Sequence, residues 1–170
     1  MSTALVAPAA VFPPRGGPTH MLGYISLLVH YGRYDMWYYF FGLFIVLHGL
    51  VHLWYVTLST RLVAFQPAMG WSGRSWIFTN LLGDAMTRTL ASGLYVLATI
   101  AFVVSGIGVM LHADWWRPVL LGSAIFSSAI ILLFWDGSMQ LVVNKGLLGL
   151  LINVMILIAL TRLQPAAAGV

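Results

Sequence analysis

The sequence predicts an all-α integral membrane protein, a four-helix bundle with a short N-terminal interfacial helix. Of its 170 residues, 61% are hydrophobic and only 7% are charged, and the mean hydropathy is +0.94. Soluble domains carry roughly 25% charged residues, so this chain could not cover a surface that faces water. Four apolar segments approach the length of about 20 residues that a helix needs to cross a bilayer. Helices are favoured because backbone polar groups in lipid must be hydrogen-bonded internally.

The N-terminal part divides into two segments. Residues 1–20 are rich in Ala and Pro and have no apolar core of useful length, so we expect a flexible tail and no signal peptide. Residues 21–31 are apolar but too short to cross, which predicts a helix lying in the membrane interface. The alternative is that this segment extends the first span across Gly32. A single four-span domain, 21–163, and a C-terminal tail, 164–170, complete the chain.

Aromatic and proline residues support the expected limits of the spans. Trp37 and Trp54 lie near the ends of the first apolar segment, as aromatic residues at membrane interfaces do. Pro118 suits the first turn of the third helix, where a missing N–H is harmless. Lys145 can extend the fourth helix toward Met139 if its long side chain reaches the interface. The four predicted spans are residues 36–58, 89–112, 116–135 and 147–163.

An even number of spans places the N- and C-termini on the same side of the membrane, here called side A. The loops after the first and third spans then lie on the opposite side, side B. Basic residues divide four to four between the two sides, so the positive-inside rule gives no orientation. We expect the membrane to be the cell membrane of a prokaryote. Small residues four apart in the second and third spans, such as Ser123 and Ser127, predict close helix packing, or alternatively a dimer interface.

His48 and His52 are the most informative residues of the chain. They lie four apart in a stretch without charged residues, 36–60, so a helix places both imidazoles on one face. Ionisable side chains are expensive in a membrane and usually face a bundle interior, a cavity or a ligand. At 1.5 Å per residue, Asn153 on the fourth span reaches a depth close to that of His52. We predict a ligand site at these three residues, although interhelical hydrogen bonds alone are an equally good interpretation.

Two further candidates lie toward side B. Asp136 follows the third span, where it could approach His52, and Arg74 lies in the long loop between the first two spans. Asp84, Arg88 and Lys145 add to the ionisable groups on this side. The alternative for Asp136 is structural, because Asp-Gly is a turn signal at a helix end. Arg74 equally well serves to shape its loop.

The sequence also argues against several classes of function. Absence of cysteine excludes disulfides, thiolate catalysis and cysteine-ligated metals. We predict no metal site, because two His residues need further ligands and no His-Glu-x-x-His motif is present. A bis-His haem lacks a second histidine at matching depth. There is no Glu, nucleophile elbow, P-loop or dinucleotide fingerprint, so enzymatic activity is uncertain and not favoured. Eight scattered basic residues form no nucleic-acid patch, and membrane lipids are their expected partners.

The first span resembles the opening helix of DoxX-like membrane proteins. That helix has a Gly followed by a His-Gly pair and Lys-Leu, and Gly42, His48, Gly49 and Leu53 fit this register. The chain departs from the pattern at His52, where the family has Lys. The resemblance implies a four-span architecture. Because family members resemble accessory subunits of quinone-linked oxidoreductases, it also implies an accessory role.

Three functions are therefore considered. The first is a non-catalytic accessory subunit of a membrane redox or energy-converting complex, with other membrane subunits or a second copy as partners. The alternative is a protein that binds, or acts on, a lipophilic small molecule such as a quinone or an isoprenoid. A weaker alternative is a haem- or pigment-binding protein in which His48 or His52 is the axial ligand.

Overall fold

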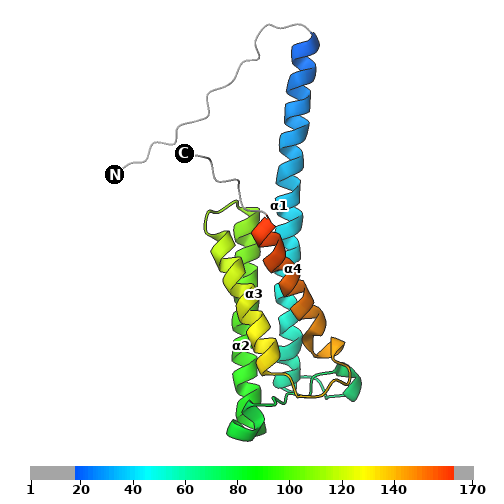
Figure 1. The fold of residues 1–170 in the computed structure, drawn as a ribbon, viewed down its shortest axis with the longest axis vertical. Helices are drawn as coiled ribbons and strands as arrows, with labels where there is room; N and C mark the ends of the chain where they lie inside the picture. The colour runs from blue at the N-terminus through cyan, green and yellow to red at the C-terminus, as the bar shows by residue number, and fades with distance from the viewer. Residues whose placement is uncertain (1–17, 163–170) are drawn as a thin grey trace, which may run out of the picture. The chain divides into compact units, whose positions relative to one another are not determined.

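The computed structural model of the chain describes residues 18–162, with side chains from Met36 onward. Two compact units are distinguished, residues 1–37 and 38–170, and the helical bundle belongs to the second. Tail residues 1–17 and 164–170 of the prediction lie outside the described part. The described part is helical and contains no strand (Figure 1). Its elements are α1 (Pro18–Ser59), the short 3-10 helix η1 (Pro67–Met69), α2 (Phe78–Met110), α3 (Trp116–Leu133), the π-helical turn η2 (Val143–Leu147) and α4 (Leu148–Arg162).

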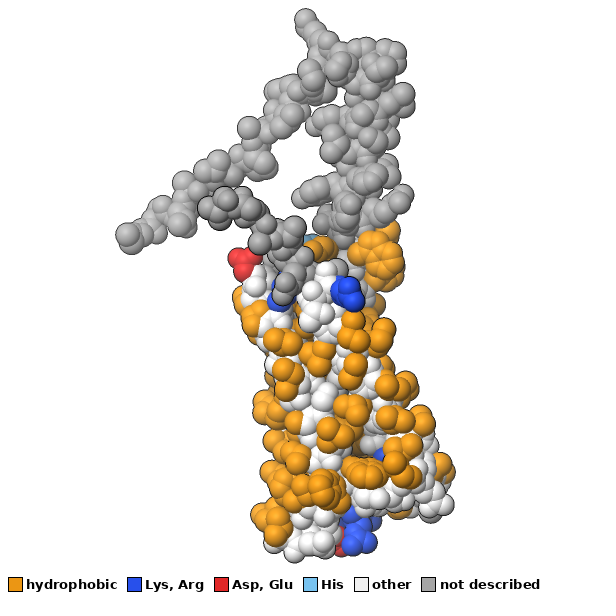
Figure 2. Space-filling model, in the orientation of Figure 1, with side chains coloured by type: hydrophobic (Ala, Val, Ile, Leu, Met, Phe, Trp, Pro, Cys, Tyr) orange, Lys and Arg blue, Asp and Glu red, His pale blue; other side chains and the backbone are white. Residues whose placement is uncertain are grey.

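Four described helices are long and apolar enough to cross a membrane, which confirms the all-α, four-span prediction at this level. Hydrophobic side chains cover the middle of the face in Figure 2, and the charged side chains lie toward its two ends. This distribution suits a bundle surrounded by lipid, since charged groups at span ends reach the polar interface. The candidate spans are Met36–Ser59, Phe78–Met110, Trp116–Leu133 and Val143–Arg162.

The element limits differ from the prediction in two places. Segment 21–31 is helical but belongs to α1 and is not a separate element, while its location in the interface stays a prediction. Helix α2 begins at Phe78, well before the expected residue 89, and has a non-helical break at Gly83 (φ 76°, ψ 167°). The sequence interpretation stopped at the last charged residues, Asp84 and Arg88. The helix continues past them because its end is exposed.

Helices α1 and α2 cross in direct backbone contact at Gly42 and Gly106. A Cβ placed on Gly106 would lie 2.6 Å from the carbonyl oxygen of Gly42, and a Cβ on Gly42 would lie 2.6 Å from that of Gly106. Only glycine allows this separation, as expected where membrane helices approach closely. The next helix, α3, packs beside α2, where Ser105 Oγ and Ser123 Oγ are 3.2 Å apart. The two helices stay close at the level of the histidines, where a Cβ on Gly49 would lie 2.6 Å from Phe102 Cβ.

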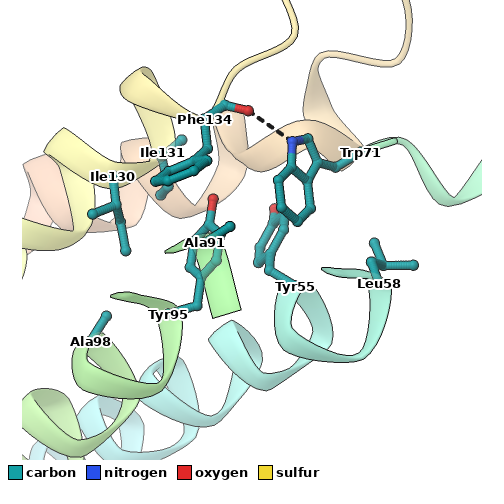
Figure 3. Packing of buried hydrophobic residues seen from close by; sticks show 9 residues of the cluster. All are labelled: Tyr55, Leu58, Trp71, Ala91, Tyr95, Ala98, Ile130, Ile131 and Phe134. Carbon is teal, nitrogen blue, oxygen red and sulfur yellow. Dashed lines mark hydrogen bonds between the residues drawn. The ribbon is translucent and has the colours of Figure 1, made fainter. Parts of the chain in front are cut away.

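The loop between α1 and α2 closes the side B end of the bundle. Its Trp71 is fully buried against Tyr55, Tyr95 and Phe134, and Figure 3 shows its indole N–H bonded to the Phe134 carbonyl oxygen. The same indole donates to the carbonyl oxygen of Arg74 at 2.9 Å. The Phe134 carbonyl follows the end of α3, so the bond from Trp71 satisfies a group near the helix end, while the bond to Arg74 lies within the loop. The third span accordingly ends at Leu133, two residues short of the predicted Trp135.

Candidate functional site

The structure joins His48, His52 and Asn153 into one buried hydrogen-bond network. His48 Nε2 lies 2.8 Å from Asn153 Oδ1, and His52 Nε2 lies 2.7 Å from Ser127 Oγ. Asn153 Nδ2 completes the network with bonds to Ser127 Oγ (2.9 Å) and Ser128 Oγ (3.2 Å). Exposed fractions are 5% for His48, 3% for His52 and 0% for Asn153. The network therefore connects α1, α3 and α4 inside the bundle.

The donor and the acceptor of each bond can be assigned, starting from His52. Its Nδ1 lies 3.2 Å from the carbonyl oxygens of both His48 and Gly49, which can only accept, so Nδ1 carries the hydrogen. In a neutral imidazole, the form favoured at membrane depth, Nε2 is then an acceptor. Ser127 must donate its single proton to this Nε2. Its oxygen in turn accepts a bond from Asn153 Nδ2, which fixes the orientation of the amide.

The amide orientation determines the tautomer of His48. Because Asn153 Nδ2 faces the two serines, Asn153 Oδ1 faces His48 Nε2 and accepts its hydrogen. Nδ1 of His48 is thus the nitrogen with the free lone pair, and within the described residues it makes no hydrogen bond. No fully buried side-chain nitrogen or oxygen in this part of the chain lacks a partner. His48 Nδ1 is therefore not completely enclosed by protein atoms, although the residue as a whole is only 5% exposed.

His48 lines a cavity of about 400 Å³ between α1, α4 and the turn η2. This volume lies within the range of about 300–1,000 Å³ that is typical of small-molecule pockets. The polar residues of the α1 wall include His48, His52 and Tyr55, at positions i, i+4 and i+7 of one helix face. Val51 and Leu148 also line the cavity and are exposed on the outside of the bundle. Exposed lining residues also come from η1 and η2, namely Ala68 and Asn144, so the cavity opens at the flank of the bundle near its side B end.

Tyr55 provides a second polar group on the cavity wall. Within the described residues, its hydroxyl makes no hydrogen bond. A Cβ on Gly146 would lie 3.3 Å from this hydroxyl oxygen and 2.8 Å from Ile131 Cγ2, so glycine leaves the space above Tyr55 open. Gly146 also has a φ of 116°, which glycine adopts without strain, and lies in the π-helical turn η2. Tyr55 follows Trp54 at the end of the predicted first span, and its spacing from His48 and His52 places it on the same helix face.

The other two predicted candidates lie away from this cavity. Asp136 accepts bonds from Lys145 Nζ at 2.8 and 3.0 Å, and the two side chains are only 14% and 6% exposed. The expected approach of Asp136 to His52 is replaced by this ion pair. Arg74 is exposed, and its Nε lies 3.9 Å from Asp84 Oδ1. Arg74 and Asp136 together line a separate cavity of about 310 Å³ at the side B end.

Within the described residues 36–162, no group of three or more His, Cys, Asp or Glu side chains is arranged so that it could hold a metal ion. No match to a protein family, a curated protein or a solved structure emerged for this chain. The resemblance of the first span to DoxX-like proteins stays a prediction, and function has to be argued from the geometry of the site.

Proposed function

We propose that this protein binds a lipophilic small molecule with a polar head group, such as a quinone or an isoprenoid, in the cavity between α1 and α4. The observation that carries the proposal is the unpartnered Nδ1 of His48. A polar atom without a partner is costly in apolar surroundings. A ligand head group that bonds to this nitrogen would remove the cost.

The completeness of the rest of the network supports a binding role over simple packing. Asn153 uses its oxygen and both amide hydrogens, and His52 uses both ring nitrogens. The two free groups, His48 Nδ1 and the Tyr55 hydroxyl, belong to residues of the same cavity wall. Such a few polar groups in a mainly apolar pocket are typical of small-molecule sites.

The position of the cavity suits a ligand dissolved in the bilayer. Its entrance lies beside the exposed side chains of Val51, Trp54 and Leu148, all within candidate membrane spans or their adjoining turn. A molecule with a long apolar tail can therefore keep the tail in lipid while its head group reaches His48.

An accessory role in a membrane redox complex is compatible with such a site and stays our prediction from the sequence. Purification in mild detergent followed by mass spectrometry tests it, and consistent isolation of the chain alone would count against it. We also propose a prokaryotic cell membrane as the location and an interfacial position for residues 21–31. Cysteine-accessibility labelling at Ser2 and Val170 should place both termini on the same side.

The binding proposal is tested with a variant that fills the cavity. Gly149 lines it, and a Cβ there would meet only Ile131 Cδ1, at 3.4 Å, so Gly149→Leu should project into the cavity. Gly122→Leu is the matched control, because a Cβ at Gly122 meets nothing within 4 Å and Gly122 lies outside the cavity lining.

Organic extraction and mass spectrometry would measure the co-purifying lipophile in the parent and in both variants. We expect the parent and Gly122→Leu to retain the lipophile. In Gly149→Leu, the amount of lipophile per protein should fall at least about tenfold. Equal retention by all three proteins would contradict the proposal. An absorption spectrum of the same samples separates the haem or pigment alternative, which would give a visible band.

A further inference from the structure

We infer that the head group of the ligand donates a hydrogen bond to His48 Nδ1, so that the site selects a hydroxyl over a carbonyl or an ether. The chemical class is a lipophile with a free hydroxyl, either a reduced quinol or an isoprenoid alcohol. This inference rests on the proposed binding function and deepens it. Its basis is the directed hydrogen-bond network behind His48.

The direction of the network is set independently at two places. The first is the pair of carbonyl oxygens of His48 and Gly49, which fix the tautomer of His52 and thereby direct the Ser127 proton. The second is on α3, where Ser128 Oγ donates to the carbonyl oxygen of Ala124 at 2.8 Å. Each serine hydroxyl already donates its single hydrogen to another acceptor, so it can only accept a hydrogen bond from Asn153. Both routes require the same amide orientation.

Reversing the direction would break several of these bonds together. If the amide of Asn153 turned over, its oxygen would face two serine oxygens whose protons are committed to His52 and Ala124. Both serines would have to abandon their present acceptors, and His52 Nε2 would lose its donor. Buried polar atoms without partners are costly, so the network holds His48 in one tautomer.

The fixed tautomer makes His48 the selective group of the cavity. A quinone carbonyl has only lone pairs, and it would face the lone pair of Nδ1 without any hydrogen between them. A hydroxyl supplies that hydrogen. The Tyr55 hydroxyl can donate or accept, so it tolerates either head group. A site built around one required hydrogen bond rejects analogues that lack it more strongly than an apolar pocket rejects a change of size.

Calorimetric titration of the full chain in lipid nanodiscs tests the selectivity with two matched pairs of probes. The first pair is farnesol and farnesyl methyl ether, and the second is decylubiquinol and decylubiquinone. In each pair only the first member, farnesol or decylubiquinol, has a hydroxyl that can donate a hydrogen bond. We expect the donor to bind about tenfold more tightly, which corresponds to about 1.4 kcal/mol. A preference in one pair alone would identify that pair as the source of the ligand.

A double variant and its control test the mechanism of selection. Ser127→Ala/Ser128→Ala removes both groups that orient Asn153, so the tenfold preference should fall toward one. Ser105→Ala/Ser123→Ala removes the same number of buried hydroxyls from the bundle without touching the network, and should keep the preference.

Nitrogen NMR of ¹⁵N-histidine gives a readout that needs no ligand. We expect the hydrogen on Nε2 in His48 and on Nδ1 in His52. A hydrogen on Nδ1 of His48, or equal binding within both pairs of probes, would overturn the inference and leave the proposed function standing. Failure of all four probes to bind would overturn both.

Discussion

Replacement of Asn153 by Ala should destabilise the bundle more than the loss of any other single amide or hydroxyl group in the described part. Three hydrogen bonds are removed, and at about 0.6 kcal/mol for an interhelical bond in a membrane protein they amount to about 2 kcal/mol. The side chain is completely buried, so the void adds about 0.5–1 kcal/mol. We expect a total loss of about 2.5 kcal/mol in the free energy of unfolding.

The assay is unfolding by SDS in mixed micelles, followed by tryptophan fluorescence. Ser105→Ala is the matched control, because Ser105 is equally buried but donates to the Ala101 carbonyl oxygen of its own helix, and between helices it only contacts Ser123 Oγ at 3.2 Å. Its loss should stay near 0.6 kcal/mol. If Asn153→Ala were no more destabilising than Ser105→Ala, the conclusion that Asn153 joins α1, α3 and α4 would be wrong.

Two further stability predictions use the same assay. Gly106→Ala should cost about 1–3 kcal/mol, because its Cβ would meet the backbone of α1, whereas Gly93→Ala, where a Cβ meets nothing within 4 Å, should be neutral or stabilising. Equal effects would contradict the close helix crossing. Lys145→Met should cost about 3 kcal/mol, because it leaves the half-buried carboxylate of Asp136 without a cation and bonded only to the Ser138 N–H. Arg74→Met, in an exposed pair, should change stability by less than about 0.5 kcal/mol, and a similar loss in both variants would refute the distinction.

The fold was predictable wherever a simple physical requirement acts along the chain. Apolar length located all four spans, because a helix must match the thickness of the bilayer. The helix ends were less predictable. Helix α2 starts early as an exposed helical stretch before the break at Gly83, and the end of α3 is bonded to Trp71, which comes from a distant loop. Hydropathy contains no information on either feature.

The site was predictable only in part, for a related reason. Depth along the helices placed Asn153 near the two histidines, and the structure joins all three. Ser127 appeared in the sequence only as a small residue suited to packing, because its role depends on which way its proton points. For Asp136 the structure shows the turn contact that was the alternative interpretation, because its Oδ1 accepts the Ser138 N–H, and it adds an ion pair with Lys145, nine residues away. Roles in ligand binding remain predictions for all of these residues.

Photolabelling tests the central claim, a lipophile held against the α1 face that includes His48, most directly. A diazirine derivative of farnesol would be cross-linked to the full chain in nanodiscs, and the modified residues mapped by mass spectrometry. We expect labels at cavity residues such as Val51, Tyr55 and Ile152. Excess farnesol or decylubiquinol should prevent this labelling, and the Gly149→Leu variant should not be labelled there. Labels spread evenly over exposed residues such as Leu47 and Leu132, unaffected by either competitor, would contradict it.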